Sequence, residues 1–485
     1  MTQSMNPPRR FHLRTYGCQM NVHDSEKVAN LLTHAGYRAS DDADEADVLI
    51  VNTCSIREKA EHRLYTDLGR LRAWKEERAG RILGIAGCVA QQEGDSLLRR
   101  FRQIDFVYGT HNLRWVPELV AAAETGGRRA ATEEDRSPDR FALPERHPDL
   151  APTTPGRSFV TVMEGCDMFC TFCVVPNTRG REISRPAEAI ASEVRVLVDQ
   201  GVREVTLLGQ TVNAYGRHDV RRGKAPQAGT ESFTHLLERL SSIPGLERIR
   251  YTSPHPRFFD DDLIRAHATL PNLCPHVHLP LQSGSDAVLE RMRRRYTADE
   301  YRAIVRDLRA TRSDLVLTTD LIVGFPGETD ADFEATLAVV EESAFVDAFS
   351  FKYSPRPETA AATLSDPVPP EVAQERLERL QSLQRGLTLA AHRARVGTET
   401  EVLVEGTSRR GGQWTGHDPY HRVVNLAVPA DLELAPGDRL PVAVVEATPH
   451  SLIGEPCGPP RRFEGRMGLV PNPQCADEPR QSARV

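Results

Sequence analysis

The chain has 485 residues, of which 39% are hydrophobic and 27% charged, and its formal net charge is −7. This composition suits a soluble globular protein of about three domains, and any nucleic-acid-binding basic face must be local. No apolar run is long enough for a transmembrane helix, and residues 1–10 form a polar tail without the apolar core of a secretory signal. We therefore expect a cytoplasmic protein, in which the nine cysteines serve as metal or catalytic ligands rather than disulfides.

Residues 11–123 alternate between apolar strand patterns and helical patterns. This βαβα order predicts an α/β unit, an open parallel sheet with helices on both faces. The expected strands are residues 11–16, 47–53, 82–86 and 104–108, and the expected helices are residues 24–35, 56–78, 90–101 and 115–123.

Three cysteines follow predicted strands of this sheet, namely Cys18, Cys54 and Cys88. The carboxyl ends of parallel strands share one edge, so residues distant in sequence meet there. Gly17 and Gly87 directly precede two of the cysteines, where a close approach to a metal cluster favours a missing side chain. Taken alone, the pattern fits a three-cysteine cluster and three small buried residues equally well.

Residues 124–157 are predicted to be a linker. The stretch 124–138 is charged and lacks apolar periodicity, and Pro152, Pro155 and Gly156 end the segment. We expect it to be mobile.

The strongest signal in the chain is the loop Cys166-Asp-Met-Phe-Cys170-Thr-Phe-Cys173, which follows an apolar strand. Three cysteines can hold three corners of a cubane iron–sulfur cluster, which ordinarily takes four, and they leave one iron open to a substrate or cofactor. Structural zinc is the first alternative, but it needs four closed ligands and no second pair of cysteines follows at a suitable distance. Because the same ligand count occurs twice, we favour a second cluster at the strand-end cysteines of the N-terminal sheet.

Residues 158–384 contain a longer series of alternating strands and helices. Six βα units predict a partial (β/α)6 barrel, with chemistry at the carboxyl ends of its strands as in full βα barrels. The expected strands are residues 159–164, 204–209, 248–253, 276–281, 315–324 and 348–353, and the expected helices include residues 187–200, 233–242, 298–310 and 331–342.

The predicted strand ends of this barrel are rich in small and polar residues, whose amides and hydroxyls could cradle a cofactor. Each turn alone is a weak signal because Gly-rich turns end most strands, but together, after a cluster loop, they fit a cofactor site. The candidates are Gly209, Gln210, Ser253, Ser283 and Gly324.

Two basic runs, residues 179–181 and 291–295, lie near the same end of the barrel. A solvated charged helix is the favoured interpretation of residues 291–295. Contact with phosphate groups is the alternative.

An amphipathic helix or helix pair at residues 369–396 leaves the barrel, and residues 385–456 form the last unit. Short strands at residues 402–404, 423–426, 440–445 and 452–454, separated by Gly and Pro turns, predict a small antiparallel β-barrel. Basic and aromatic side chains there could meet RNA phosphates and bases, and a plain barrel with surface charges is the alternative. The candidate RNA contacts are Arg409, Arg410, Trp414 and Arg422.

Residues 457–485 form a tail rich in Pro and Arg, which we expect to be disordered. Two cysteines of this tail, Cys457 and Cys475, and Cys274 of the barrel receive no role.

Several strings of the chain, over residues 11–456, together resemble the methylthiotransferase family of radical S-adenosylmethionine (SAM) enzymes. The strings around Cys18 and Cys54 favour the branch that modifies dimethylallyladenosine in tRNA. The strings are Thr15-Tyr-Gly-Cys-Gln-Met-Asn21, Asn52-Thr-Cys-Ser-Ile-Arg-Glu-Lys-Ala-Glu61, Gly87-Cys-Val-Ala-Gln91, Val162-Met-Glu-Gly-Cys166, Leu207-Leu-Gly-Gln210 and His278-Leu-Pro-Leu-Gln-Ser-Gly-Ser285.

The resemblance implies a methylthiotransferase N-terminal domain, a radical SAM core and a C-terminal TRAM domain. One SAM would donate a methyl group to a sulfur at the N-terminal cluster. A second would yield the 5′-deoxyadenosyl radical that removes hydrogen from C2 of the adenine, and Phe172 would pack near the adenine of SAM. The implied ligands are Cys18, Cys54 and Cys88 for one 4Fe–4S cluster and Cys166, Cys170 and Cys173 for the other.

The implied partners are the anticodon loop of tRNA, a reducing electron donor and a sulfur source. The target base must leave its stack to reach the clusters. We expect a monomer without membrane contact. Asn177, Thr211 and Glu358 depart from the family pattern, but none is a predicted ligand.

Other branches of the family act on threonylcarbamoyladenosine in tRNA or on a ribosomal-protein aspartate. From another class, a non-catalytic iron–sulfur RNA-binding protein is the alternative. The barrel and the open-iron motif argue against it, because a binding module needs neither.

Overall fold

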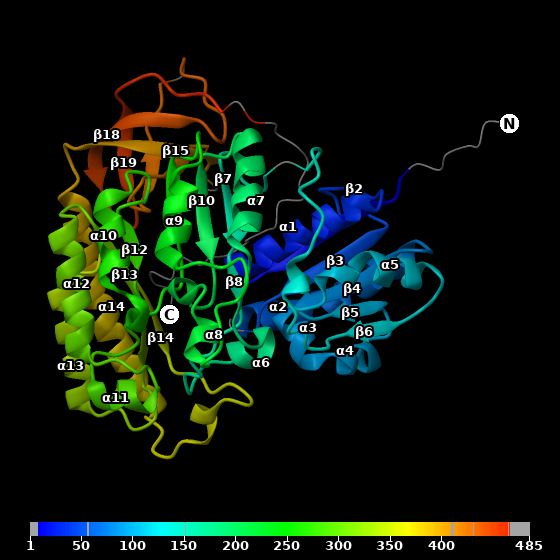
Figure 1. Cartoon of the computed structure of the whole chain (residues 1–485), viewed down its shortest axis with the longest axis horizontal. Helices are drawn as coiled ribbons and strands as arrows, with labels where there is room; N and C mark the ends of the chain where they lie inside the picture. The colour runs from blue at the N-terminus through cyan, green and yellow to red at the C-terminus, as the bar shows by residue number, and fades with distance from the viewer. Residues whose placement is uncertain are drawn as a thin grey trace.

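The structure is a computed structural model that describes residues 8–55, 58–150, 152–408, 412–429, 431–463 and 465. Figure 1 shows a sheet unit (blue to cyan) beside a central α/β unit (green to yellow), with a small β-barrel (orange) at one end of the central unit. The α/β class and the succession of units agree with the prediction from the sequence.

The N-terminal unit is a parallel sheet covered by helices on both faces, as predicted. Its elements are β1 (Arg10–Tyr16), α1 (Gln19–His34), β2 (Arg38–Ala39), β3 (Val48–Thr53), α2 (Glu58–Glu77), β4 (Ile82–Gly87), α3 (Cys88–Glu93), α4 (Asp95–Arg100), β5 (Phe106–Tyr108), α5 (Val116–Glu124) and β6 (Arg129–Ala131). The strand order is β2-β1-β3-β4-β5-β6. The central strands β3 and β4 are buried along their whole length, which explains the apolar run at residues 48–51 and the absence of charged residues from both strands.

Helix boundaries near the cysteines differ from the prediction in two places. α1 starts at Gln19 rather than residue 24, so Cys18 directly precedes the helix. The expected helix 90–101 is two short helices, because Gly94 between them adopts a left-handed φ of +48° that ends α3. The short strands β2 and β6 were not predicted.

The segment 124–157, predicted as a mobile linker, is partly built into the fold. β6 extends the sheet by pairing in parallel with β5. Arg140 forms a buried ion pair of 3.1 Å with Glu164 of the central unit, and Asn30 donates hydrogen bonds to the carbonyls of Pro144 and Glu145. The segment is thus attached to both units at these points.

The central unit is an open partial barrel of parallel strands wrapped by helices, as predicted. Its strands form two parallel sheets, β11-β10-β7 and β12-β13-β14, which a bridge between Ile249 and Leu273 connects. Its main elements are β7 (Arg157–Thr161), α7 (Ala187–Asp199), β10 (Glu204–Leu208), α9 (Phe233–Ser241), β11 (Arg248–Tyr251), α10 (Asp261–Thr269), β12 (His276–His278), α12 (Ala298–Thr311), β13 (Val316–Val323), α13 (Asp330–Ser343), β14 (Asp347–Lys352) and α14 (Pro370–Arg393). One hydrophobic core lies between these strands and the helices around them.

Several short elements at the carboxyl ends of the core strands were not predicted. They are β9 (Ile183–Ser184) and the helices α6 (Val175–Arg179), α8 (His218–Arg221) and α11 (Asp286–Arg291); β9 pairs in antiparallel with β8 (Met163–Glu164), which is the end of the strand predicted at residues 159–164. They surround the loop that carries the cysteine motif.

The C-terminal unit is a closed β-barrel in the order β15-β16-β17-β19-β18. Its strands are β15 (Glu399–Thr407), β16 (Trp414–His417), β17 (Val423–Leu426), β18 (Arg439–Ala447) and β19 (Leu452–Pro456), of which β16 was not predicted. The predicted start of this unit at residue 385 lies inside α14. Gln384 of that helix donates a hydrogen bond of 2.7 Å to the Phe345 carbonyl, so the helix belongs to the central unit.

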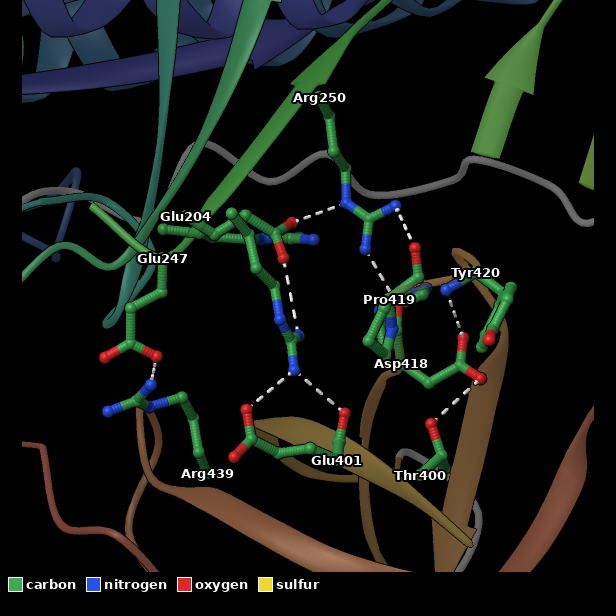
Figure 2. A network of polar contacts seen from close by, with 12 residues as sticks. Glu204, Glu247, Arg250, Thr400, Glu401, Asp418, Pro419, Tyr420 and Arg439 are labelled. Carbon is green, nitrogen blue, oxygen red and sulfur yellow. Dashed lines mark hydrogen bonds and ion pairs between the residues drawn. The ribbon is translucent and has the colours of Figure 1, made fainter. Parts of the chain in front are cut away.

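The C-terminal barrel docks on the ends of the core strands opposite to the cysteine loop. Figure 2 shows the contact: Arg250 of β11 bonds Glu204 at 2.8 Å and reaches the carbonyls of Asp418 and Pro419 at 2.8 and 2.9 Å. Arg248 bonds the carboxylate of Glu401 at 2.9 Å. Since Glu204 and Arg248 begin their strands, the C-terminal barrel lies at the amino end of the core and the cysteine loop at the carboxyl end (Figure 1).

None of the helices in the described ranges is long and apolar enough to cross a lipid bilayer.

Candidate functional site

The structure brings the three strand-end cysteines of the N-terminal sheet together. β1, β3 and β4 are adjacent and end in register, with Tyr16 beside Thr53 and Thr53 beside Gly87. Cys18, Cys54 and Cys88 follow these ends, and hydrogen bonds link the Cys54 thiol with the other two. The predicted meeting of the three residues is therefore present in the fold.

The pKa is lowered for two of the three thiols at this site, which favours their negatively charged form. The hydrogen bond from Cys54 lowers the pKa of Cys18 to about 6 and that of Cys88 to about 7, against the opposing effect of burial. The same bonds, with burial, raise the pKa of Cys54 well above its usual value. Thiolates are the form that binds iron, so this donor set fits a cluster held by three cysteines.

Gly17 and Gly87 are required by the packing of the strand ends themselves. Both adopt positive φ angles, +137° and +90°. A Cβ on Gly17 would run into the side chain of Cys54, and one on Gly87 into the Thr53 carbonyl. The missing side chains therefore let neighbouring strand ends approach each other, which places the three thiols side by side.

Two buried asparagines support the first cysteine, and sequence reasoning assigned them no role. Asn21 Oδ1 lies 3.2 Å from Cys18 Sγ, and Asn21 Nδ2 donates to Asn52 Oδ1 at 2.9 Å. Asn52 in turn donates to the Ser25 hydroxyl at 3.0 Å. Such supporting hydrogen bonds orient metal ligands, and only the motif strings around Cys18 and Cys54 pointed to them.

The second set of cysteines lies on one loop between β8 and α6. The backbone amide of Cys166 donates to the Gly180 carbonyl at 3.1 Å, and that of Cys173 to the Cys170 carbonyl at 3.0 Å. Burial raises the pKa of Cys166 to about 12 and that of Cys173 to about 11. A bound cation is thus needed to hold these thiols as thiolates, which fits a metal cluster in an apolar surround.

Arg294 is a site residue that the sequence interpretation missed. Its Nη1 atom donates to Cys170 Sγ at 3.4 Å, and its guanidinium stacks 5.3 Å from the Tyr296 ring centroid. The favoured prediction of a solvated helix at residues 291–295 is wrong here, because α11 ends at Arg291 and Arg294 is buried. The sequence of a run of arginines does not indicate which of their side chains is buried.

The predicted SAM-binding residues divide into two groups. The first stays near the cysteine loop: Phe172 packs against Phe325 and Met292, and Gln210 has a buried Oε1 without a hydrogen-bond partner in the described part of the chain. Ser253 has a left-handed φ of +56°, and a side chain at Gly209 would collide with Met163.

The second group faces the helix layer. The Ser283 hydroxyl lies 3.2 Å from that of Thr336 on α13. Gly324 has a φ of +71°, and a Cβ there would meet Ala373 of α14. Helix packing thus accounts for the small residues at these two positions.

The predicted RNA contacts lie in different surroundings in the structure. Arg422 is only 7% exposed, and burial lowers its pKa to about 10 against the opposing effect of Asp347 and Asp418. Its prediction as a phosphate contact is wrong, because the side chain lies in the interface with the central unit. Trp414 packs partly against the core of the C-terminal barrel, and Arg409 and Arg410 lie outside the described residues.

The cysteines that received no role lie in different surroundings. Cys274 is buried and Cys457 exposed. Cys475 lies outside the described residues.

Arg294→Gln is expected to slow the reductive SAM cleavage that the sequence resemblance implies roughly 10- to 100-fold, as is typical for residues that support metal ligands. The variant loses a charge and a donor at Cys170, so we also expect a more negative reduction potential for the core cluster. Arg293→Gln, an exposed neighbour in the same basic run, is the matched control. Equal 5′-deoxyadenosine formation by both variants would contradict this role.

The class of protein follows from this geometry. A three-cysteine loop at the carboxyl end of an open parallel α/β barrel defines a radical SAM enzyme, and residues 160–340 match the family model described as the radical SAM superfamily. Residues 10–109 match "Uncharacterized protein family UPF0004" and residues 393–457 match the TRAM domain. The cofactors of this class are 4Fe–4S clusters and SAM.

The narrower family follows from comparison with curated proteins. The chain is 50% identical over 455 residues to tRNA-2-methylthio-N(6)-dimethylallyladenosine synthase of Geobacter metallireducens, covering 93% of this chain and 99% of the relative. It is 47% identical over 484 residues to the protein of that name from Sorangium cellulosum, covering 96% and 97%. The chain belongs to the family of tRNA-2-methylthio-N(6)-dimethylallyladenosine synthases.

Solved structures agree at the level of the fold. The chain is similar to the radical SAM methyltransferase TsrM from Kitasatospora setae with tryptophan substrate and a SAM analog bound, with a TM-score of 0.56 and 14% identity. That match covers 79% of this chain and 90% of the other. A second TsrM structure, with cobalamin and a [4Fe-4S] cluster bound, gives a TM-score of 0.53 and 15% identity, covering 73% and 77%.

Proposed function

We propose that this protein adds a methylthio group to C2 of N6-dimethylallyladenosine at position 37 of the tRNA anticodon loop. The observation that carries the proposal is the pair of three-cysteine sets, one at the edge of the N-terminal sheet and one on the core loop. A single set would suffice for radical formation, whereas the second offers a place for the sulfur. The relatives named for this reaction support the choice of substrate.

Radical chemistry suits this substrate. The C2–H bond of adenine has no easily removed proton, so general acid–base catalysis would fail where hydrogen abstraction succeeds. When bound, the two 4Fe–4S clusters and SAM supply the electron, the radical, the methyl group and the site for the transferred sulfur. The residues proposed to hold the clusters are Cys18, Cys54 and Cys88 in the N-terminal unit and Cys166, Cys170 and Cys173 in the core.

The chain's own residues bind and orient these groups. Asn21 holds Cys18, and Arg294 holds Cys170 and places a positive charge beside it. Thr211, which departs from the family pattern, lies 3.3 Å from Cys166 Sγ and supports that ligand. The apolar side chains of Met168, Val175 and Phe258 pack around the core cysteines and keep water away from them.

The C-terminal barrel is proposed to bind tRNA at a fixed distance from the chemistry, since it docks on the opposite end of the core. A tRNA that touches this barrel must therefore extend along the core to bring its anticodon loop to the cysteine edge. An external electron donor, a sulfur source, a monomeric state and a cytoplasmic location complete the proposal.

Anaerobic turnover with defined substrates tests the function. Reconstituted protein, SAM, a reductant, a sulfur source and tRNA containing dimethylallyladenosine should yield the methylthio nucleoside, detected by mass spectrometry after nuclease digestion. Product only with tRNA containing threonylcarbamoyladenosine, or only with the ribosomal-protein aspartate, would move the chain to another branch of the family. SAM cleavage without any sulfur insertion would overturn the proposal.

A further inference from the structure

Arg179 ends α6 in the central unit, yet its guanidinium belongs to the environment of the N-terminal cysteines. The side chain is 3% exposed, and its Nη2 atom donates to Asp24 Oδ2 of α1 at 2.7 Å. Next to it, the Thr110 hydroxyl donates to the Thr178 carbonyl at 2.6 Å, which fixes the end of α6 against the N-terminal unit. α6 also packs on α3, the helix that Cys88 begins.

The hydrogen bonds of Arg179 are incomplete. Its Nη1 atom is buried and has no hydrogen-bond partner among the described residues. A guanidinium carries five N–H donors, and a buried donor left unpaired is energetically unfavourable. A fold rarely leaves such a donor in place without an acceptor that binds there.

Arg179 lies beside the strand-end cysteines, because Asp24 belongs to the helix that follows Cys18 and α6 packs on the helix that Cys88 begins. The charge of Arg179 contributes to lowering the pKa of both Cys18 and Cys88. Burial alone would lower the pKa of Arg179, but Asp24, Cys88, Glu164 and Cys18 outweigh it and hold that pKa well above its usual value. Arg179 thus remains a cation beside the three thiols.

The core site also has a buried arginine beside its cysteines, and there the donor nitrogen already has a hydrogen-bond partner. There Arg294 Nη1 donates to Cys170 Sγ at 3.4 Å from a buried position. Each cysteine set therefore has one buried arginine, and the arginine of the N-terminal set comes from the other unit of the protein. Hydrogen bonds to the sulfurs of an iron–sulfur cluster raise its reduction potential.

We propose that Arg179 is a positioning residue of the N-terminal site, donating through Nη1 to a sulfur of the cluster held by Cys18, Cys54 and Cys88. The inference rests on the proposed function for the presence of that cluster. Arg179 stabilises negative charge on the cluster sulfurs and raises the reduction potential of the cluster. Because it follows the core cysteine loop directly in sequence, it also ties the two cysteine sites to each other.

The test uses full-length protein in which Cys166, Cys170 and Cys173 are alanine, so that the N-terminal cluster alone is observed. In this background Arg179→Gln should keep its iron and shift the midpoint potential to a more negative value, with altered g-values in the electron paramagnetic resonance (EPR) spectrum. With the core cysteines intact, Arg179→Gln should reduce methylthio insertion roughly 10- to 100-fold and leave SAM cleavage within about twofold of the parent.

His23→Gln is the matched control for the same interface. His23 Nδ1 lies 2.7 Å from the Thr161 hydroxyl and ties α1 to the central unit, and His23 is not among the main influences on the pKa values of the three thiols. We expect its potential and EPR spectrum to match those of the parent. An equal shift in His23→Gln and Arg179→Gln would assign the effect to a loosened interface and overturn the inference.

The remaining outcomes also decide the question. An unchanged potential and spectrum in Arg179→Gln would overturn the inference while leaving the proposed function intact. Failure of the parent to load any N-terminal cluster would overturn the proposed function itself. If Arg179→Gln loses its iron, the test uses Arg179→Lys instead, which retains the charge but not the forked donor. A midpoint potential and EPR spectrum identical to those of the parent would then overturn the proposed hydrogen bond.

Discussion

Replacing Cys18, Cys54 and Cys88 together with alanine is expected to halve the iron content and abolish sulfur insertion, while reductive SAM cleavage continues. Two cubane clusters carry about eight irons per chain, and the loss of one leaves about four. The two cysteine sets lie on different units, and the hydrogen bonds of the core cysteines are made with Gly180, Thr211, Arg294 and the loop itself, all in the central unit. The core site should therefore load and react without the N-terminal one.

The mirror variant, with Cys166, Cys170 and Cys173 replaced by alanine, should keep about four irons and lose SAM cleavage altogether. Iron and acid-labile sulfide per chain, 5′-deoxyadenosine and modified nucleoside are measured on the parent and both triple variants after anaerobic reconstitution. About four irons in both the parent and the N-terminal variant would contradict a second cluster. The chain would then be a radical SAM enzyme with one cluster and no site for sulfur.

Local patterns in the sequence were enough to predict the frame of this molecule. Continuous apolar runs such as residues 48–51 identify strands buried on both faces, because a polar side chain is unfavourable there unless it finds a hydrogen-bond partner. The parallel order then places the ends of such strands at one edge, which is how Cys18, Cys54 and Cys88 could be grouped without a structure. Their grouping depends only on strand order and register.

The orientation of individual arginines could not be predicted, because it depends on partners far away in sequence. Arg179 pairs with a residue 155 positions earlier in the chain, and Arg294 reaches a cysteine 124 positions earlier. Arg422 was expected on the surface, but the docking of the C-terminal barrel buries it. The sequence around a basic residue is similar whether its side chain is buried or exposed. Only the packing of the units therefore shows which of these arginines point inward.

Arg250→Ala is expected to release the C-terminal barrel from the core at a cost of about 3–5 kcal/mol, the range for breaking a buried ion pair by removing one partner. Figure 2 shows why: one guanidinium joins Glu204 of the core to two backbone carbonyls of the C-terminal barrel. Arg250 and Glu204 are each about 5% exposed as side chains. Removing Arg250 leaves the carbonyls of Asp418 and Pro419 without this donor.

Hydrogen exchange measures the effect where it arises, because a chain of several units does not unfold in one step. Amides of β16, β17 and the turn between them should exchange roughly a hundredfold faster or more, since each 1.4 kcal/mol is a factor of ten. Arg157→Ala is the control, because its ion pair with Glu405 spans the same interface at 2.7 Å but is partly exposed, with side chains 27% and 20% accessible. We expect about 1 kcal/mol or less from that pair.

Acid should weaken the same contact in the unmodified protein. Burial alone would raise the pKa of Glu204, but Arg250 and Arg248 outweigh it and lower that pKa from 4.5 to about 2. A carboxylate with a depressed folded-state pKa stabilises the fold fully above its unfolded value, so its contribution is lost as the pH falls from 4.5 toward 2. Arg250→Ala should show little of this acid-dependent loss, because the main partner of Glu204 is already gone. The same acid response in the variant and the parent would show that Glu204 does not hold the C-terminal barrel in place.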